Sequence, residues 1–263
     1  MPLPNICFTA LCLTSLLPTL VVGEEFRSLF DGKTLSGWKA LDMSYWSVQD
    51  SAITAESTTD HPCTSNQFLV WQGGDVADFE LKLQFRVRGN GCNSGVQFRS
   101  RMNDRGLAIG YQADIYQSGG YLGGVCDELH QRKGPELLTA NGKRTVIDEA
   151  GKRVATDLGQ TAKMKPYPEW NEYHITARGQ HMILSINGVR CSELIDQETG
   201  HFDLSGILGL QLRSGSPMRV QFKEIQYRSL DQWRCLADSY PPWHTGVQSP
   251  HSEPSLFPVP HHQ

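Results

Sequence analysis

The stretch DFELKLQFRVR, residues 78–88, alternates apolar and polar side chains from end to end. Its apolar positions are Phe79, Leu81, Leu83, Phe85 and Val87. Successive side chains of a β-strand point to opposite faces, so a period of two over this length predicts a strand with one dry face and one wet face. A chain that contains such a strand has to cover the dry face with a second layer of structure.

The same alternation recurs along the chain. It is found in residues 93–101, 110–115, 173–179, 181–191, 207–215 and 218–227. Asn187-Gly188 interrupts one of these segments, and this pair favours the positive backbone angles of a tight hairpin. The sequence contains no pattern typical of a long amphipathic helix. It therefore predicts an all-β fold in which two antiparallel sheets pack face to face as a jelly-roll β-sandwich.

Residues 1–23 are predicted to be a signal peptide. Within them, residues 6–22 form an uncharged, mostly apolar run that contains Pro18 and is shorter than the roughly 20 residues of a membrane-spanning helix. This pattern predicts export of the chain to the periplasm or to the outside of the cell. Because no Lys or Arg precedes the run, a membrane anchor that stays on the chain remains the alternative.

The remainder of the chain divides into a domain and a tail. Residues 24–237 carry the strand patterns and are predicted to form the sandwich domain. Residues 238–263 are rich in Pro, Ser and His, a composition that cannot build a core, and are predicted to be disordered. Residues 132–170 are charged and rich in turn residues, so we expect a functional loop or a mobile flap between two strands.

Charge and cysteine content argue against two classes of function. The chain has 24 Lys and Arg residues and 28 Asp and Glu residues, so its formal net charge is −4. It therefore has no excess of positive charge of the kind that binds nucleic acid. Five cysteines follow residue 23, and they have no metal-finger spacing. We interpret them as mostly buried small hydrophobic residues with at most a disulfide among them. These five are Cys63, Cys92, Cys126, Cys191 and Cys235.

The strands predicted at residues 93–101 and 110–115 carry unusual side chains opposite their apolar residues. These side chains are Gln97, Arg99, Gln112 and Asp114. A sheet that holds amides, a cation and an anion on its outer face has the groups needed to bind a polar ligand. The alternative is a simple ion pair between Arg99 and Asp114 on a solvated face, worth only about 0.2–1 kcal/mol.

Several spaced motifs resemble the 3-keto-disaccharide hydrolase domain, formerly a domain of unknown function numbered 1080. They are FRSLFDGKTLSGWKA, YWSVQDSAITAES, DFELKLQFRV, NSGVQFRSR, GYQADI, EWNEYHITARG and INGV. The similarity runs from about Phe26 to Leu230. It implies a concanavalin A-like β-sandwich, in agreement with the alternation, and it implies a carbohydrate partner.

The activity that the resemblance implies is the cleavage of a glycoside that has been oxidised to a ketone at carbon 3 of the sugar. The ketone acidifies the hydrogen on carbon 2, so a base can remove it, and the resulting enolate expels the group on carbon 1. Water then adds to the unsaturated product. Such an enzyme needs a base, an electrophile at the ketone oxygen, and a proton donor for the leaving group.

The central part of the sequence offers candidates for each role. The candidate catalytic residues are Asp114, Asp127, Glu128, His130 and Arg99, and the candidate substrate-binding residues are Gln97, Gln112, Asn93 and Arg213. Carboxylates beside an apolar wall can act as base or acid, and Arg99 can stabilise an enolate oxygen. His130 can shuttle a proton, while the amides of Gln97 and Gln112 suit sugar hydroxyls.

Two alternatives stay open at this stage. The first is a lectin-like module that binds carbohydrate on a polar sheet without chemistry, because this kind of sandwich hosts both functions. The second concerns Cys126, which stands where the family pattern has a tyrosine, so the substrate preference of this chain is in question. No cofactor is expected: Glu128 and His130 have the spacing of two metal ligands, but two ligands do not make a site.

Overall fold

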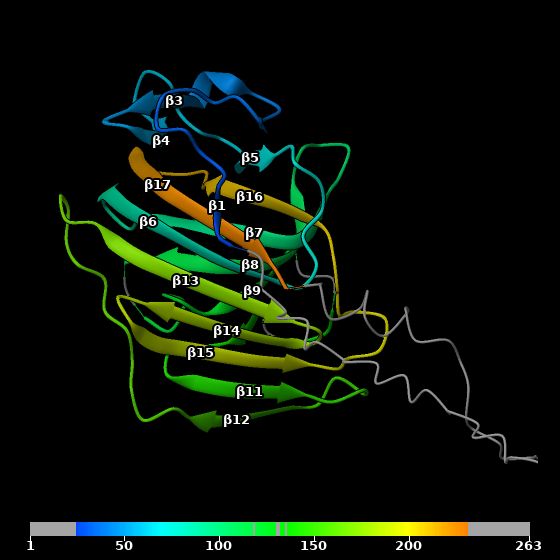
Figure 1. Ribbon diagram of the computed structural model, residues 1–263. Coiled ribbons are helices and arrows are strands. Elements are labelled where there is room, and N and C mark those ends of the chain that lie inside the picture. The colour runs from blue at the N-terminus through cyan, green and yellow to red at the C-terminus, as the bar shows by residue number, and fades with distance from the viewer. Residues whose placement is uncertain (1–24, 118, 130–131, 135, 231–263) are drawn as a thin grey trace, which may run out of the picture. The chain divides into compact units, whose positions relative to one another are not determined.

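The computed structural model describes residues 25–230 apart from residues 118, 130, 131 and 135. The predicted signal peptide at 1–23 and the predicted tail at 238–263 lie outside this range and stay predictions. The described residues fold as two sheets that lie over each other as two layers (Figure 1). They include no helix long and apolar enough to cross a membrane. The predicted all-β sandwich is confirmed.

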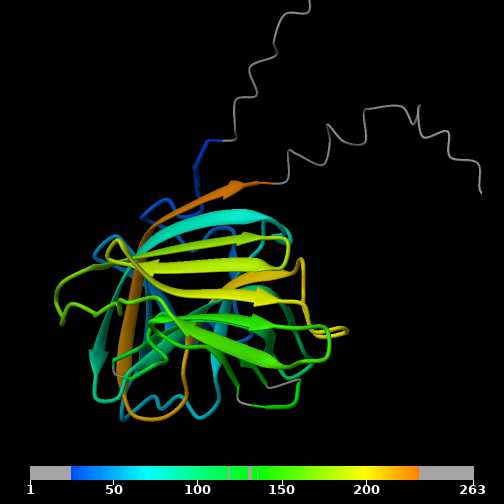
Figure 2. The ribbon, with the colours of Figure 1, turned by 90° about the horizontal axis from the view of Figure 1, so that it is seen from below.

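The first layer is a ten-stranded sheet, and nine of its strands follow in one continuous path. In spatial order these are β12 (Arg153–Asp157), β11 (Lys143–Ile147), β15 (Val189–Asp196), β14 (His181–Ile186), β13 (Asn171–Arg178), β6 (Phe79–Gly89), β17 (Met218–Ser229), β4 (Ala52–Ser57) and β3 (Trp46–Gln49). The short strand β1 (Arg27–Ser28) pairs with β17 off this path. Seen from below, β11 and β12 (green) form the near edge of this sheet (Figure 2).

The second layer is a seven-stranded sheet. In spatial order its strands are β10 (Leu137–Thr139), β9 (Val125–Glu128), β8 (Ala108–Tyr116), β7 (Asn93–Met102), β16 (Ile207–Leu212), β5 (Gln67–Trp71) and β2 (Trp38–Lys39). A short 3₁₀ helix, η1 (Met43–Tyr45), follows β2. Strands far apart in sequence, such as β7 and β16, are therefore neighbours at the centre of this sheet.

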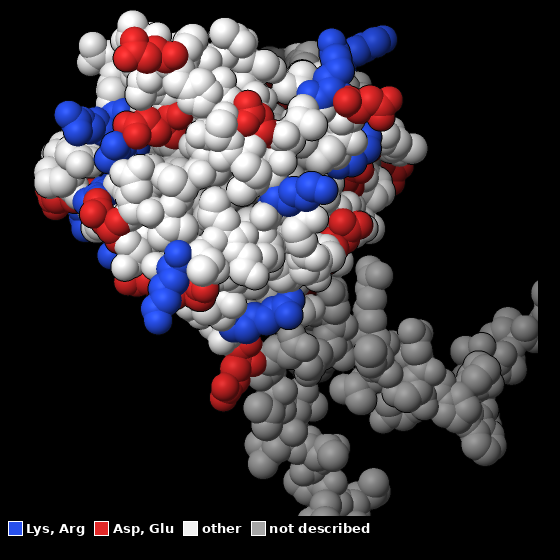
Figure 3. Space-filling view, turned by 90° about the horizontal axis from the view of Figure 1, so that it is seen from above, with Lys and Arg blue, Asp and Glu red and all other residues white. Residues whose placement is uncertain are grey.

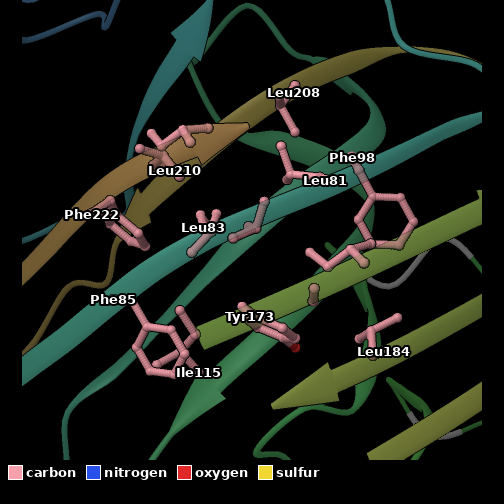
Figure 4. Packing of buried hydrophobic residues seen from close by; sticks show 14 of the residues in the cluster. Leu81, Leu83, Phe85, Phe98, Ile115, Tyr173, Leu184, Leu208, Leu210 and Phe222 are labelled. Atoms are coloured by element: carbon pink, nitrogen blue, oxygen red, sulfur yellow. The ribbon is translucent and has the colours of Figure 1, made fainter. Parts of the chain in front are cut away.

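The core lies between the two sheets, where their apolar faces meet. All five apolar residues of the long alternating stretch are buried. Figure 4 shows Leu81, Leu83 and Phe85 of β6 packed in one cluster with residues of the other sheet. The rings of Phe79 in β6 and Phe98 in β7 meet edge to face with their centroids 5.9 Å apart. The apolar face predicted for residues 78–88 is thus confirmed.

The hairpin predicted at Asn187-Gly188 is confirmed. These two residues connect β14 to β15 and have positive φ angles of 51° and 77°. Two positive φ angles in a two-residue loop match the right-handed twist of the flanking strands, which is why Asn-Gly is favoured there. Within the described part of the chain, the cysteines at 63, 92, 126 and 191 are free and buried, as small hydrophobic residues are.

The prediction for residues 132–170 was wrong. Instead of a loop or flap, this segment contributes β10 to one sheet and β11 and β12 to the edge of the other. β11 pairs in parallel with β15, from residue 143 beside 192 to residue 147 beside 196. The partner strand of β11 is distant in sequence, so no local pattern indicates that β11 is a strand. The turn residues of segment 132–170 mark the connections between its short strands, and they favour a loop when the sequence is read alone.

Charged side chains are dispersed over the end of the sandwich at which β3 and β4 lie. The space-filling view of this end shows acidic and basic residues in small, mixed groups among uncharged ones (Figure 3). Neither sign dominates the face drawn there. Among the described residues, this face therefore offers no patch of a single charge for a charged ligand.

Candidate functional site

Six polar side chains come together on the outer face of the seven-stranded sheet, and we call them the outer-face cluster. They are Gln97, Gln112, Asp114, Cys126, Glu128 and Gln211, and all six are buried. They alternate along β7, β8, β9 and β16 with residues of the core, so they point away from it. Gln97 lies opposite Gln112, which in turn lies opposite Cys126.

Gly95 makes room for this cluster. It pairs with Asp114 across β7 and β8 on the outer face. A Cβ atom at this position would lie 2.5 Å from both Cγ and Cδ of Gln112, much closer than real contacts allow. The missing side chain of Gly95 thus lets the amide of Gln112 lie flat over the sheet beside Asp114.

Amides and a hydroxyl hold one half of the cluster. Nε2 of Gln97 donates a hydrogen bond to Oε1 of Gln112 over 2.9 Å, and Oγ of Ser100 donates to Oε1 of Gln97 over 3.1 Å. These bonds use an oxygen on each of the two glutamines. The two side chains therefore have a fixed orientation before any ligand binds.

Glu128 is held by two further amides. Its Oε1 accepts hydrogen bonds from Nδ2 of Asn66 over 3.1 Å and from Nε2 of Gln211 over 3.3 Å. Asn66 is fixed in turn, because its Oδ1 accepts from the backbone nitrogen of Ser214 over 2.9 Å. A carboxylate on β9 is thereby tied to β16 and to the loop before β5.

Asp114 differs from Glu128 because half of its carboxyl group has no partner. Oδ2 accepts a hydrogen bond from Sγ of Cys126 over 3.4 Å, but Oδ1 is buried and without a partner among the described residues. The same holds for Oε1 of Gln211 and Oδ1 of Asn93 on this face. Buried polar atoms are nearly always paired, so three unpaired oxygens on one face indicate a place for a ligand or water.

Burial shifts the ionisation of both carboxyl groups in the cluster. It raises the pKa of Asp114 from the usual 3.8 to about 7, although the bond from Cys126 and the charge of Arg213 oppose the shift. Burial also raises the pKa of Glu128, and the charge of Glu136 adds to that effect. Near neutral pH, Asp114 is therefore able both to take and to release a proton.

The raised pKa of Asp114 predicts that stability depends on pH. The folded state binds this proton more tightly than the unfolded state does. Protonated Asp114 therefore contributes to the free energy of unfolding, and this contribution is fully present below about pH 4 and is lost as pH rises through about 7. One pKa unit corresponds to about 1.4 kcal/mol, so we expect a loss on the order of 3 kcal/mol. Urea unfolding at pH 5 and pH 8 measures this loss, and Asp114→Asn should remove most of it. An equal pH dependence in both proteins would contradict the assignment.

Arg99 does not belong to the outer-face cluster, although the alternation predicted that it would. A β-bulge between Phe98 and Arg101 inserts an extra residue, and Arg99 has a φ of 47° there. Its buried guanidinium donates to the backbone oxygen of Ala77, to Oδ1 of Asp78 and to the backbone oxygen of Gly179. Arg99 thus connects the seven-stranded sheet to turns of the other sheet, away from Asp114.

Asp127 also lies on the other side of its sheet. As the neighbour of Glu128 in β9 it points inward, where Oδ2 accepts a hydrogen bond from Nε of Arg132 over 3.1 Å. Nη1 of Arg132 also donates to Oδ2 of Asp196 over 2.7 Å, and this oxygen accepts from the hydroxyl of Tyr111 over 2.5 Å. Asp127 and Glu128 are both buried in β9, but they point to opposite faces of the sheet.

The other predicted residues have the following places. Asn93 lies on the outer face opposite Tyr116, and Arg213 follows β16 at an exposed position from which it acts electrostatically on Asp114 and Glu128. His130 lies outside the described residues. No group of three or more His, Cys, Asp or Glu side chains within the described part of the chain is placed to hold a metal ion.

Three residues of the site were not predicted. Gln211 is on the same alternating face of β16 as Arg213, so the sequence pattern already contained its signal. Asn66 comes from a loop, where period two carries no information. Tyr121 is partly exposed, its ring packs edge-on against that of Tyr116 at 6.3 Å, and it interacts electrostatically with Asp114.

Comparison with known proteins identifies the family. The model of the 3-keto-alpha-glucoside-1,2-lyase-like domain matches residues 25–228, which is most of the chain. The chain belongs to this family. Membership indicates a carbohydrate-related function, either hydrolase-like or carbohydrate-binding. No curated protein is significantly similar to the chain in sequence.

Solved structures support the fold of this family member. A protein from Parabacteroides distasonis ATCC 8503, described provisionally as a glycosyl hydrolase, superposes with a TM-score of 0.53 at 17% identity, over 78% of this chain and 94% of that chain. The carbohydrate recognition domain of Emp47p gives 0.51 at 14% identity, over 78% and 96%. The exoplasmic/lumenal domain of VIP36, in its Ca²⁺/Man-bound form, gives 0.50 at 9% identity, over 78% and 92%. At these identities the likeness concerns the concanavalin-like sandwich fold alone.

Proposed function

We propose that the chain cleaves 3-keto-glycosides by removing the proton on carbon 2 of the sugar and eliminating the group on carbon 1. The observation that carries the proposal is Asp114, a buried carboxyl with a pKa of about 7 and an oxygen that has no partner among the described residues. A base works best when its pKa lies near the working pH, because it is then ionised and still binds a proton well.

Asp114 is the candidate base. The thiol of Cys126 donates to Oδ2, and burial raises the pKa of that thiol, so it keeps its proton and remains a donor. This bond leaves Oδ1 to accept the proton from carbon 2. In this proposal, the cysteine that stands where the family has a tyrosine orients the base.

Arg213 is the candidate electrophile, in place of Arg99. Loss of the carbon 2 proton leaves its electron pair in an enolate, whose negative oxygen is on carbon 3. Arg213 is the cation that acts on both carboxyl groups of the cluster, and a guanidinium presents paired donors to an oxyanion. The amides of Gln97 and Gln112 lie beside Asp114 on the same face and suit the remaining sugar hydroxyls.

Glu128 is the candidate proton donor. When the enolate collapses, the ketone re-forms, a double bond joins carbons 1 and 2, and the bond from carbon 1 to the leaving oxygen breaks. That oxygen takes the electron pair and needs a proton. A carboxyl with a raised pKa holds one for longer as pH rises. Water then adds across the double bond, with its hydroxyl on carbon 1 and its proton on carbon 2.

The test is cleavage in deuterium oxide. The chain is incubated with a 3-keto-glucoside and, in parallel, with the same glucoside before oxidation. Elimination followed by hydration places one deuterium on carbon 2 of the released sugar, whereas the unoxidised glucoside should stay intact. The control is the 3-keto sugar incubated without protein for the same time, because hydrogens beside a ketone also exchange with solvent.

Two results would contradict the proposal. Cleavage without deuterium beyond the control would indicate direct hydrolysis rather than elimination. Binding of the 3-keto-glucoside without cleavage would favour the lectin-like module that the fold also permits.

A further inference from the structure

An apolar groove lies on the same outer face as the cluster. It has a volume of about 250 Å³ and is lined mainly by carbon atoms. Its floor is formed by Phe68 and Val70, which alternate along β5 with the core residue Leu69. Leu41 and Met102 contribute to its walls.

The register of the strands joins this groove to the cluster. In β16, Gly209 pairs with Gln97 on one side and with Val70 on the other, and Gln211 pairs with Phe68. Neighbouring strands lie about 4.8 Å apart, so Gln97 and Val70 are roughly 10 Å apart across the glycine. A ligand that contacts both residues must therefore be longer than a single sugar ring.

Gly209 places no side chain on the outer face between the two regions. A Cβ atom there would lie 3.4 Å from the backbone oxygen of Leu69, 3.6 Å from Cδ1 of Ile207 and 3.7 Å from Cγ2 of Val70, which are ordinary contacts. The position thus has space above it and no backbone clash that demands glycine. A ligand can therefore extend from the cluster into the groove without meeting a side chain at position 209.

The chemistry of the groove selects its occupant. Apart from Lys39 and Gln72, the lining offers only apolar side chains and Gly106. A second sugar would therefore place most of its hydroxyl groups against carbon without hydrogen bonds from the protein, which is unfavourable. An apolar ring gains free energy there, because its surface is removed from water. The volume is below the range of about 300–1,000 Å³ for pockets of drug-sized ligands, so it suits a single ring.

We propose that the substrate is a 3-keto-glycoside whose carbon 1 carries an apolar, ring-sized alcohol, with the sugar on the outer-face cluster and the ring in this groove. The inference rests on the proposed function, since it names the leaving group of that reaction. The released product is then an apolar alcohol rather than a second sugar.

The test compares the 3-keto forms of benzyl glucoside and methyl glucoside. Both release simple alcohols of similar reactivity, so a difference in KM reports the ring. We expect KM to be about 10-fold or more lower for the benzyl substrate, as burial of a ring implies. The 3-keto form of a glucose disaccharide should resemble the methyl substrate. Equal KM for all three substrates would overturn the proposal.

Two variants locate the effect. Leu41→Ser removes a groove wall at a side chain that is 77% exposed, so the fold should tolerate it. We expect KM for the benzyl substrate to rise about 3- to 10-fold, while kcat and KM for the methyl substrate stay unchanged. Gly209→Val should place a side chain between the cluster and the groove and have the same selective effect, and its melting curve shows whether it is folded. Val154→Ser, at a 54% exposed valine of β12 in the other sheet, is the matched control and should change neither KM.

A binding experiment tests the groove even if the proposed catalytic function fails. If no substrate is cleaved, calorimetry measures binding of the benzyl and methyl compounds to the same proteins. Tighter binding of the benzyl compound that is lost in Leu41→Ser supports the groove even without catalysis. Equal binding of both compounds, or a Leu41→Ser protein that binds them as the natural chain does, overturns it.

Discussion

Replacing Asp114 by asparagine is expected to lower the turnover of a 3-keto-glycoside by about 10²- to 10⁴-fold, the usual contribution of a positioned base. Asparagine has almost the same size and can still accept the bond from Cys126, but its amide cannot take a proton from carbon 2. Because the natural base must be ionised, turnover should rise with pH as Asp114 loses its proton near pH 7, and it should fall where Glu128, the proton donor with a raised pKa, loses its own proton. Initial rates between pH 5 and pH 9 measure both effects.

The controls separate chemistry from folding. Asp60→Asn, at an exposed loop position, makes the same chemical change away from the cluster and should leave the rate unchanged. The Asp114→Asn protein should unfold at a higher urea concentration than the natural chain at pH 8, because it no longer buries an ionised carboxylate. A folded Asp114→Asn protein whose rate is within a few-fold of the natural chain would exclude Asp114 as the base.

Replacing Arg132 by methionine is expected to destabilise the fold by about 3–5 kcal/mol, the usual effect of removing one partner from a buried ion pair. Methionine fills much of the space but leaves the carboxylates of Asp127 and Asp196 buried without their cation. In a domain of this size, the loss corresponds to roughly 6–20 °C in melting temperature. Urea unfolding and a thermal melt measure it.

The matched control is Arg144→Met. The side chain of Arg144 is 41% exposed, and its Nε lies 3.3 Å from Oε1 of Glu193. An ion pair of this kind contributes about 1 kcal/mol or less, so this variant should melt close to the natural chain. If both variants lose the same small amount of stability, the buried ion pairs of Arg132 with Asp127 and Asp196 do not stabilise the fold as expected.

The fold could be predicted largely because its signals are local. Alternation in residues 78–88 identified both the strand and the face that it buries, and Asn187-Gly188 identified a hairpin. The strands of residues 132–170 were missed because what stabilises β11 is a parallel partner, β15, about fifty residues away. Short strands of this kind depend on pairing rather than on their own pattern.

The site could be predicted in part. Period two correctly placed Gln97, Gln112 and Asp114 on one outer face, because nothing interrupts it there. It failed at Arg99, where a bulge adds a residue to the strand and no glycine or proline at that position indicates the bulge in the sequence. Asp127 is different: the same period applied to β9 predicts that it faces opposite to Glu128, so the sequence pattern already excluded one of these two candidates from the outer face.

The opposite orientations of Asp127 and Glu128 have a consequence for recognition. Asp127 is anchored from inside the sandwich by Arg132, and Glu128 is anchored from outside by Asn66 and Gln211. Strand β9 is therefore held by hydrogen bonds on both of its faces, so the Glu128 carboxylate is already in place when a ligand binds. Little affinity is then lost to ordering the protein, and rigid, well-matched sugars should be preferred over flexible ones.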